Sequence, residues 1–306
     1  MRVLKGHNDA IDSVAMTPDG RLAITGGGHY ELEGGGTSLC VWDISRGRVV
    51  GRLRGHTRNI LAVGITLDGR FAVSAGYDLS VFVWDVERST CVWSIQHSRP
   101  VRAVAISDDG NIVISGGGTE GDYDGGDKGV RVADRRGGSS SLLDRHYHMV
   151  SALAISPSGD RAVIASQDTL FVYDDTRWNS ARKLEGQGGT IYSVALSRDG
   201  RIAISSGGGD GQTLRVWAVK EGTCIRGWGV PQSGTRTLGA VALTADGRLA
   251  VSGSSDGTVR VWDVGQGKCL RLLEGHTDSV GGVAISSDGS IVVSGASDHT
   301  LRVWEG

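Results

Sequence analysis

Apolar and polar residues alternate along the chain in short runs that recur in the same order seven times. Each unit begins with a run such as SVAMT (13–17) or AVGIT (62–66), passes a glycine, and continues with a run such as LAIT (22–25) or FAVS (71–74). Alternation with a period of two predicts strands, and a glycine turn between two such runs predicts an antiparallel hairpin. The turn glycines are Gly20, Gly69, Gly110, Gly159, Gly200, Gly247 and Gly289.

Two further runs complete each unit. The third is exemplified by LCVWD (39–43) and VFVWD (81–85), and the fourth by the polar-led RVVGRL (48–53) and KCLRLL (268–273). Four strands in a unit of about 40 to 45 residues, without helical periodicity, are typical of a propeller blade. The pattern therefore predicts an all-β, seven-bladed β-propeller with four antiparallel strands per blade.

Composition and charge narrow the function. The 306 residues include 49 glycines and only 4 prolines, which suits short strands and tight turns. The net charge of -2 gives no overall field that would attract nucleic acid or an anionic membrane. The first residues have no signal-like apolar segment, and no run approaches the roughly 18 apolar residues needed to cross a bilayer. We expect a cytoplasmic protein that binds neither nucleic acid nor membrane.

The four cysteines are spread along the chain. Cys91, Cys224 and Cys269 stand at equivalent places in three units, and Cys40 lies inside another predicted strand. This spacing favours reduced packing residues over a disulfide framework or a zinc site. We therefore expect no metal and no cofactor.

At this point the chain resembles the WD-repeat (tryptophan-aspartate repeat) family over its whole length. The resemblance rests on Gly-His pairs at 6–7, 55–56 and 275–276 and on Trp-Asp pairs at 42–43, 84–85 and 262–263. Departures are local, since Ala133 and Tyr173 replace the tryptophan, Gln187 replaces the histidine, and PQSGTRT (231–237) replaces the Gly-His pair of the sixth unit. The preference for arginine over lysine suggests a bacterial member with a GC-rich genome.

The ends of the chain fit one closed ring. The last unit supplies only three strands, and the opening RVL (2–4) precedes the first Gly-His pair as a fourth strand does elsewhere. In similar propellers the two ends of the chain share a blade, which hides an edge strand. We expect residues 1–306 to form a single domain of seven repeats, with residues 1–4 completing the seventh blade.

The resemblance also implies a structural role for the recurring histidines. In similar propellers such a histidine bonds an aspartate between the second and third strands, and a serine and the tryptophan complete the network. The matching residues are His56, Ser74, Asp78 and Trp84 in the second unit and His276, Ser294, Asp298 and Trp304 in the seventh. As metal ligands the histidines would have to converge within about 2 Å of one ion, which equivalent positions around a ring cannot do.

Extra residues between the second and third strands mark one face of the ring. HYELEGGGTS (29–38) and TEGDYDGGDKG (119–129) are the longer insertions, and repeat insertions often lie on the binding face. Asp122, Asp124 and Asp127 could form an oxygen cage for calcium, but the terminal glutamate of a calcium loop is missing, which favours a solvated acidic loop.

Partners of similar proteins dock on this loop-bearing face. The positions that match by register are Asp12, Asn59, Leu61, Tyr77, Arg102, Ser151, Tyr192 and Gly281. Tyrosine and arginine are enriched at interface hot spots. We therefore expect a monomeric, non-catalytic scaffold or sensor module that binds a peptide, a protein or other domains of the same larger protein.

Two alternatives remain open. The acidic insertion would suit a small-molecule or calcium-ion sensing domain of a larger signalling protein. An enzyme with a site at the channel mouth, near Asp12 and Arg102, is less favoured because the chain contains no HExxH helix and no CxxC pair.

Overall fold

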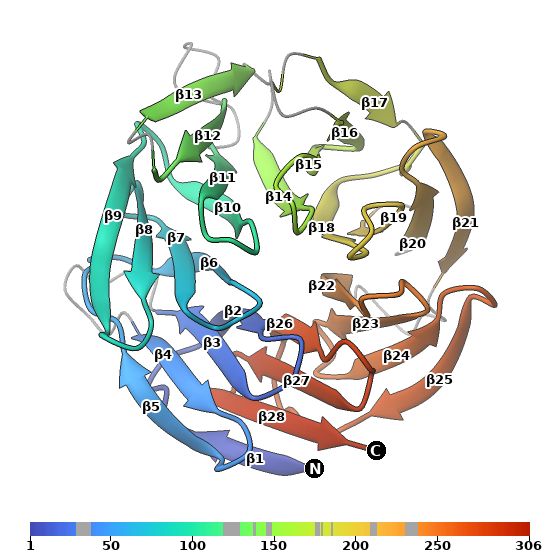
Figure 1. Ribbon diagram of the computed structural model, residues 1–306. Coiled ribbons are helices and arrows are strands. Elements are labelled where there is room, and N and C mark those ends of the chain that lie inside the picture. The colour runs from blue at the N-terminus through green and yellow to red at the C-terminus, as the bar shows by residue number, and fades with distance from the viewer. Residues whose placement is uncertain are drawn as a thin grey trace.

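The structure is a computed structural model that describes residues 1–28, 38–118, 129–136, 139–144, 149–174, 178, 180–184, 186–208, 213–229 and 238–306. These residues form seven four-stranded antiparallel sheets arranged as blades around a central channel (Figure 1). Among them there is no helix long and apolar enough to cross a membrane. The predicted all-β, seven-bladed propeller is confirmed.

Blades are numbered 1 to 7 along the chain. The innermost strands are β2 (Ile11–Met16), β6 (Ile60–Ile65), β10 (Val101–Ile106), β14 (Val150–Ile155), β18 (Ile191–Leu196), β22 (Leu238–Leu243) and β26 (Val280–Ile285). The second strands are β3 (Leu22–Gly27), β7 (Phe71–Gly76), β11 (Ile112–Gly117), β15 (Ala162–Ser166), β19 (Ile202–Gly207), β23 (Leu249–Ser254) and β27 (Ile291–Ala296).

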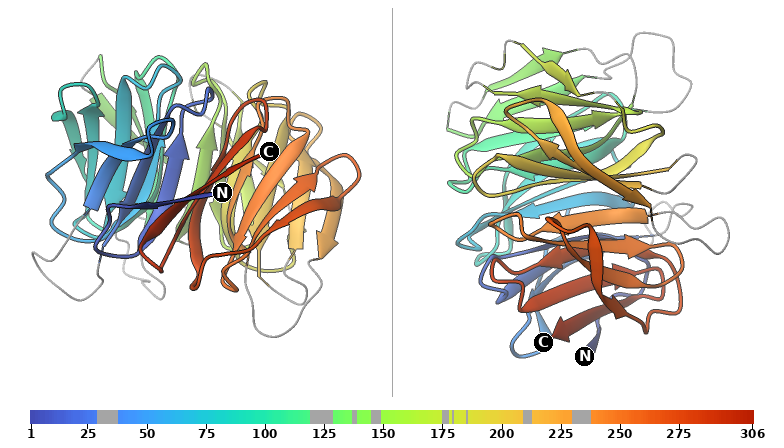
Figure 2. Two further views of the ribbon diagram at one scale, coloured as in Figure 1. Left: turned by 90° about the horizontal axis from the view of Figure 1, so that it is seen from below. Right: turned by 90° about the vertical axis from the view of Figure 1, so that its right-hand side faces the viewer.

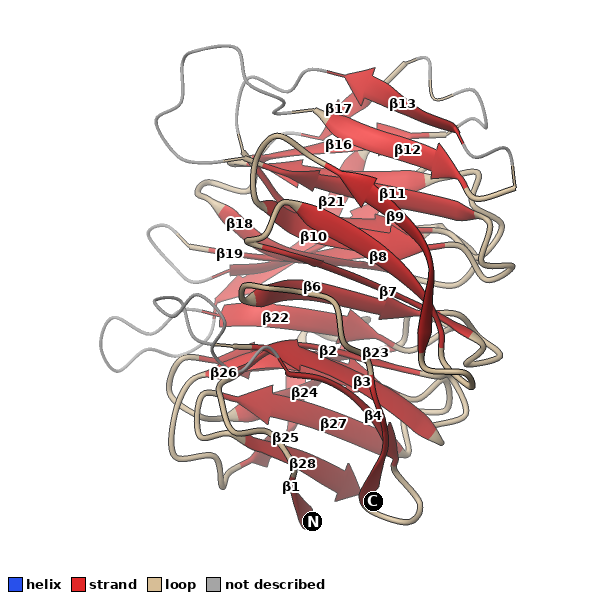
Figure 3. Cartoon of the chain, turned by 90° about the vertical axis from the view of Figure 1, so that its left-hand side faces the viewer, coloured by secondary structure: helices blue, strands red, loops and turns tan. Residues whose placement is uncertain are grey.

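The outer half of each blade follows the same order. The third strands are β4 (Ser38–Asp43), β8 (Ser80–Asp85), β12 (Val130–Asp134), β16 (Thr169–Tyr173), β20 (Thr213–Ala218), β24 (Val259–Asp263) and β28 (Thr300–Glu305). The outermost strands are β5 (Arg48–Arg52), β9 (Thr90–Gln96), β13 (Ser139–Asp144), β17 (Arg182–Leu184), β21 (Thr223–Gly229), β25 (Lys268–Leu273) and, in blade 7, β1 (Arg2–Lys5). Figure 3 shows the strands running between two loop-bearing faces.

The turn glycines are required by the backbone. All seven adopt φ between 68° and 76°, a left-handed conformation that residues with a side chain rarely take. Space is also short, because a Cβ on Gly20 would lie 2.7 Å from Cδ1 of Ile291 in the neighbouring blade. Each turn thus closes one hairpin and packs against the preceding blade of the ring.

The hydrophobic core lies between blades. Ile24 and Val41 of blade 1 pack with Ile60 and Trp84 of blade 2 in one cluster, and the same arrangement recurs around the ring. Burying a side chain of this size contributes about 1.5–3 kcal/mol. Neighbouring blades therefore stabilise one another.

The N-terminal strand closes the ring. β1 pairs with β28 in antiparallel register from Arg2↔Val303 to Lys5↔Thr300, and Leu4 is buried there. Arg2 also forms an ion pair with Glu305. Both termini therefore lie at the outer edge of blade 7 (Figures 1 and 2), and the expected closure is confirmed, with the strand covering residues 2–5.

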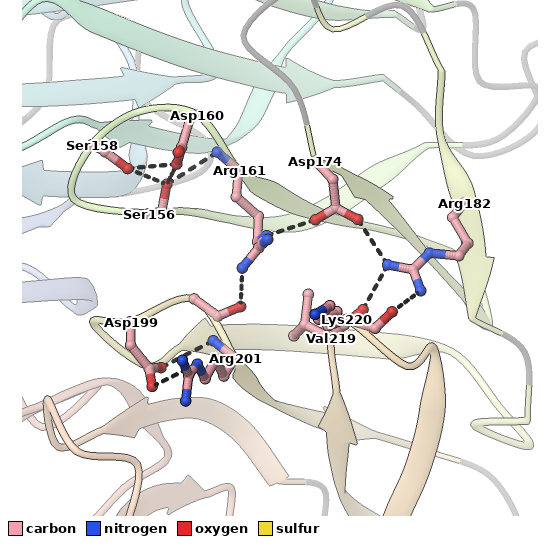
Figure 4. Close-up of polar contacts among 11 residues, drawn as sticks. Ser156, Ser158, Asp160, Arg161, Asp174, Arg182, Asp199, Arg201, Val219 and Lys220 are labelled. Carbon is pink, nitrogen blue, oxygen red and sulfur yellow. Dashed lines mark hydrogen bonds and ion pairs between the residues drawn. The ribbon is translucent and has the colours of Figure 1, made fainter.

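Arginines on outer strands connect blades. Arg182 in β17 donates to the carbonyls of Val219 (2.7 Å) and Lys220 (2.5 Å) in blade 5 and to the carboxylate of Asp174 (2.7 Å). Asp174 also accepts from Arg161, which reaches the carbonyl of Gly200 at 2.9 Å (Figure 4). This network joins the irregular blade 4 to blade 5.

The same outer position carries arginine in three successive blades. Arg226 donates to the carbonyl of Gln266 (3.4 Å), Arg271 to that of Gly306 (3.3 Å), and Arg2 to that of Ile44 (2.9 Å). Together with the Arg182 contacts, arginine bridges thus occupy the junctions from blade 4 through blade 7 to blade 1.

The expected packing role of three cysteines is wrong. Cys91, Cys224 and Cys269 are exposed, and only Cys40 is buried. Each exposed cysteine lies near the start of an outermost strand, which has a neighbouring strand on one side only. All four are free of disulfides, as expected.

Candidate functional site

A cavity of about 340 Å³ opens at the mouth of the central channel. Three consecutive residues from each innermost strand line it. The first of the three residues from each strand forms a ring at the channel entrance, made of Asp12, Leu61, Arg102, Ser151, Tyr192, Gly239 and Gly281. We call this ring the upper mouth, after the face that bears the loops before the innermost strands.

The side chains of this ring reach the channel because of β-bulges. In β2, Ile11 pairs with Gly27 and Ser13 with Gly26, so Asp12 is the extra residue that has no partner in β3. The same register shift occurs at the equivalent residue of all seven innermost strands. A bulge redirects the side chain of its extra residue. In each blade the bulge therefore places the residue without a ladder partner at the channel mouth.

Asp12 provides a carboxylate at this mouth. Its Oδ2 accepts a hydrogen bond from Nδ2 of Asn59 at 3.0 Å. Burial raises the pKa of the Asp12 carboxyl, and the Asn59 hydrogen bond opposes that shift only in part. A cationic or hydrogen-bond-donating group that entered the cavity would find here a carboxylate poorly solvated by water.

Arg102 provides the opposite charge. Its Nη2 lies 3.3 Å from the hydroxyl of Tyr77, its Nε donates to the carbonyl of Gly118 at 3.4 Å, and its guanidinium lies 5.7 Å from the centre of the Tyr77 ring. These contacts fix the guanidinium at the edge of the cavity. The mouth therefore carries an acidic and a basic group on blades 1 and 3, separated by Leu61 of blade 2.

The remaining positions differ strongly in size. Tyr192 is 43% exposed and stands as the large aromatic group of the ring. Gly239 and Gly281 leave the sector of blades 6 and 7 without side chains. A Cβ on Gly281 would come within 2.6 Å of the carbonyl of Ile11. The mouth therefore has no side chain on blades 6 and 7 at this level and carries its large aromatic group on blade 5.

The structure separates the eight sequence-predicted positions into two groups. Asp12, Leu61, Arg102, Ser151, Tyr192 and Gly281 line the cavity. Asn59 is only 1% exposed and acts through Asp12, and Tyr77 lies behind Arg102. Sequence reasoning missed Gly239, although counting back from the apolar run of blade 6 (GAVAL against GGVAI in blade 7) would have located it.

The opposite end of the channel holds a smaller cavity. A cavity of about 210 Å³ there is lined by Leu67, Asp108, Arg198 and several aliphatic side chains. Oδ2 of Asp108 in blade 3 lies 3.8 Å from Nη2 of Arg198 in blade 5. Burial raises the pKa of Asp108 while Arg198 lowers it. We call this end the lower mouth.

The two predicted histidine networks are present as hydrogen bonds. In blade 2, Trp84 Nε1 donates to Ser74 Oγ (2.8 Å), which lies 2.7 Å from Nε2 of His56, whose Nδ1 lies 2.8 Å from Oδ2 of Asp78. The carboxylate can only accept, so Nδ1 carries the proton. In blade 7, the corresponding distances for Trp304, Ser294, His276 and Asp298 are all 2.8 Å. These histidines form hydrogen bonds within their own blades, and neither lines the cavity at the channel mouth.

Other blades contain parts of this network. In blade 1, Thr25 Oγ1 lies 2.5 Å from Nε2 of His7 and accepts from Nε1 of Trp42 at 2.7 Å, and in blade 5 the hydroxyl of Ser205 donates to Oε1 of Gln187 at 2.6 Å. Nδ1 of His7 is buried and finds no hydrogen-bond partner among the described residues. Burial, together with Arg52 and His299, lowers the pKa of His7 to about 4. A neutral imidazole is therefore built into blade 1.

The structure bears differently on two motifs that suggest chemistry in the sequence. Asp122, Asp124 and Asp127 lie outside the described residues, and within the described ranges no three His, Cys, Asp or Glu side chains gather as metal ligands would. The string GSSDG (253–257) has the spacing of a nucleophile elbow. It forms the hairpin turn between β23 and β24, without the helix that such an elbow requires.

Comparison with known proteins agrees with this architecture. The model of the family described as "WD domain, G-beta repeat" matches residues 1–43, 47–85, 89–134, 178–218, 229–263 and 267–305. The chain is 26% identical over 67% of its length to the U3 small nucleolar RNA-associated protein 15 homolog of Xenopus laevis. It is 27% identical over 50% of its length to Autophagy-related protein 16 of Arabidopsis thaliana, and 26% identical over 66% to Cilia- and flagella-associated protein 52 of Sus scrofa.

These alignments cover 37%, 30% and 31% of the respective relatives, so the chain matches about a third of their length. The family model matches well over half of the chain in six segments and leaves residues 135–177 unmatched, and the two tryptophan–histidine networks lie in matched segments. The protein therefore belongs to the WD domain, G-beta repeat family.

Proposed function

We propose that this protein is a non-catalytic interaction module that binds a peptide or a loop of a partner protein at the upper mouth. The observation that carries this proposal is the ring of bulged residues, which places Asp12, Arg102 and Tyr192 around one open cavity. A polypeptide offers the matching groups, namely backbone donors and acceptors, charged side chains and apolar surface.

The polar groups of the mouth are arranged for recognition. Arg102 is held by Tyr77 and Gly118, and Asp12 is held by Asn59. The hydroxyl of Ser151 bonds the carbonyl of Ala165 at 3.4 Å, and none of the residues that line the cavity is a histidine, lysine or cysteine. The carboxylate of the described lining, that of Asp12, accepts from the Asn59 amide and not from a hydroxyl, so it does not form the nucleophile–base pair that acyl or phosphoryl transfer needs.

The same proposal includes the setting in which the module works. We propose that residues 1–306 act as one monomeric domain in the cytoplasm, because β1 and β28 share a blade and the four cysteines remain unpaired. Other domains of a longer protein would be partners of the same kind as separate proteins. The names of the relatives refer to different cellular structures and processes, so family membership alone does not identify the partner of this protein.

The test is a selection from a random peptide library on the immobilised protein, followed by affinity measurements with individual peptides. The upper-mouth variant carries Tyr77→Ala, Arg102→Ala and Tyr192→Ala. The matched control carries Leu67→Ala, Asp108→Ala and Arg198→Ala at the lower mouth, and both variants must first melt like the wild type. We expect the upper-mouth variant alone to lose the selected peptides. Retention by that variant would exclude the upper mouth as the binding site.

A further inference from the structure

Exposed aliphatic side chains gather on the outermost strands. Among the described residues, the exposed large apolar side chains are Met1, Val3, Val50, Val92, Tyr192, Ile225, Leu270 and Leu272. Apart from Met1 and Tyr192, all of them lie on β1, β5, β9, β21 or β25. The apolar surface that this protein shows to solvent is therefore concentrated on its rim.

β-Bulges place four of these side chains. In β25, Cys269 pairs with Trp262 and Arg271 with Val261, so Leu270 is the extra residue. The same shift leaves Ile225 as the extra residue in β21, and Val50 and Val92 in β5 and β9. A bulge protects an edge strand from pairing with other chains whatever its side chain is. Repeated aliphatic residues at this position therefore need a separate explanation.

The outermost strands of blades 5 and 6 carry charged residues of one sign. The sequences of β21 (TCIRGWG) and β25 (KCLRLL) contain Arg226, Lys268 and Arg271 and no acidic residue. The protein as a whole carries a net charge of -2, so this is a local basic surface on a slightly acidic molecule. Such a surface attracts an acidic partner locally, whereas the rest of the protein has no net positive charge that would attract one.

The two strands form one continuous surface. A Cβ on Gly267, in the turn that leads into β25, would lie 3.1 Å from Cδ of Arg226 and 3.2 Å from the Trp228 ring. The side chains of Ile225, Leu270 and Leu272 are 48–53% exposed. Figure 1 shows β21 and β25 following each other around the rim of blades 5 and 6. We call Ile225, Arg226, Lys268, Leu270, Arg271 and Leu272 the rim patch.

We propose that the rim patch is a second docking surface, which binds an acidic segment of a partner protein that also carries aliphatic side chains. Arg226 and Arg271 each use Nη1 to bond a carbonyl of the next blade, which holds their guanidinium groups in place. A fixed, planar guanidinium suits the carboxylates of Asp and Glu. The aliphatic side chains between these cations supply the apolar contact.

A protein occupant fits this surface better than a membrane does. Membrane interfaces favour exposed tryptophan and tyrosine. Trp228, the aromatic residue of β21, is turned inward and its ring lies 6.0 Å from that of Trp262. The exposed apolar groups of the patch are aliphatic, and its two arginines are tied to the protein backbone.

The test uses a fluorescent peptide of alternating glutamate and leucine, with serine–leucine and lysine–leucine peptides of the same length as comparisons. Binding is measured by fluorescence anisotropy at low and high salt. We expect only the glutamate–leucine peptide to bind, and salt to weaken it. The charge variant Arg226→Gln/Lys268→Gln/Arg271→Gln and the apolar variant Ile225→Ser/Leu270→Ser/Leu272→Ser should each weaken binding about tenfold or more.

Two controls separate this surface from others. The variant Lys5→Gln/Arg48→Gln/Val50→Ser makes the same kinds of change on blades 7 and 1, and the upper-mouth variant tests the first proposed surface; both should bind the peptide like the wild type. If a triple variant does not melt like the wild type, the single changes Arg271→Gln and Leu272→Ser replace it.

Three results would overturn the proposal. The first is equal binding of the glutamate–leucine and serine–leucine peptides. The second is undiminished binding by the patch variants. The third is binding of the patch to vesicles of anionic phospholipid without binding of the peptide, which would identify a membrane as the occupant.

Discussion

Replacing Asp78 by asparagine tests the network of blade 2. The side chain of Asp78 is 6% exposed, and its two oxygens accept from Nδ1 of His56 at 2.8 Å, from the backbone N–H of Thr57 at 2.9 Å and from that of Ser80 at 3.2 Å. Asparagine keeps one acceptor oxygen and presents an amino group in place of the other. In either orientation at least one buried N–H then faces a second donor.

The magnitude follows from these bonds. An unsatisfied buried donor costs about 1–3 kcal/mol, and the surviving bonds weaken because their acceptor loses its charge. Together we expect a loss of about 2–4 kcal/mol in the free energy of unfolding. For a chain of 306 residues, an unfolding entropy of about 2.1 cal/mol/K per residue converts this loss to a fall in Tm of about 3–6 °C.

The pH dependence gives a second readout. Burial raises the pKa of Asp78, but the hydrogen bonds from His56, Thr57 and Ser80 outweigh it and the net pKa is lowered from 3.8. A carboxyl with a lowered pKa stabilises the fold above its unfolded pKa, and this contribution is lost as the pH falls through the folded pKa. The difference in Tm between wild type and Asp78→Asn should therefore narrow below about pH 3.8.

The assay is a thermal melt followed by circular dichroism, with Asp298→Asn as the equivalent change in blade 7. Asp278→Asn is the control, because Asp278 lies in the same blade, is exposed, and accepts through its carboxylate from the backbone N–H of the adjacent Ser279. If Asp78→Asn and Asp298→Asn lower Tm no more than Asp278→Asn, the hydrogen-bond reasoning for these networks is wrong.

Three further predictions concern other parts of the ring. Deleting residues 1–4 should lower Tm by at least about 5 °C and promote aggregation, because the core loses Leu4 and β28 becomes an open edge; an unchanged melt would contradict the closure. Stability should fall as the pH drops from 6.5 to about 4, where unfolded His7 is protonated and folded His7 is not, and His7→Gln should flatten a urea-denaturation profile over this range. Arg182→Ala should lower Tm by about 1–3 °C, against no change for the exposed Arg248→Ala, and equal melts would show that the bridge between blades 4 and 5 adds no stability.

The order of strands within each blade was predictable from sequence, because each hairpin depends on residues close together in the chain. A left-handed glycine such as Gly20 and the alternating runs around it specify a hairpin without reference to the rest of the chain. Ring closure was predictable for a related reason, since the unit containing Trp304 lacked a fourth strand that residues 2–5 could supply. Local signals of this kind do not depend on which blade is the neighbour.

The rim was predicted less well. Cys224 and Cys269 stand at equivalent places in their repeats, beside an apolar run, and from sequence they looked like packing residues. Their exposure depends on lying in a strand with one open edge, which a residue pattern does not encode. The arginine bridge from Arg182 to blade 5 was likewise invisible, because it joins residues 37 and 38 positions apart across a blade junction.

The candidate site falls between these cases, and the β-bulge explains why. Register placed Asp12, Arg102 and Tyr192 at the loop-bearing end of the innermost strands, but strict alternation would not have shown that three consecutive residues from each strand line the channel. The bulge adds one residue that has no partner in the ladder, so the side chain at that position can differ from blade to blade, as it does between Asp12, Arg102 and Tyr192. The same device operates on the rim, where Ile225 and Leu270 are the extra residues. A repeat can therefore keep one set of residues for packing and vary another for recognition, and in this propeller bulge residues contribute to both proposed surfaces.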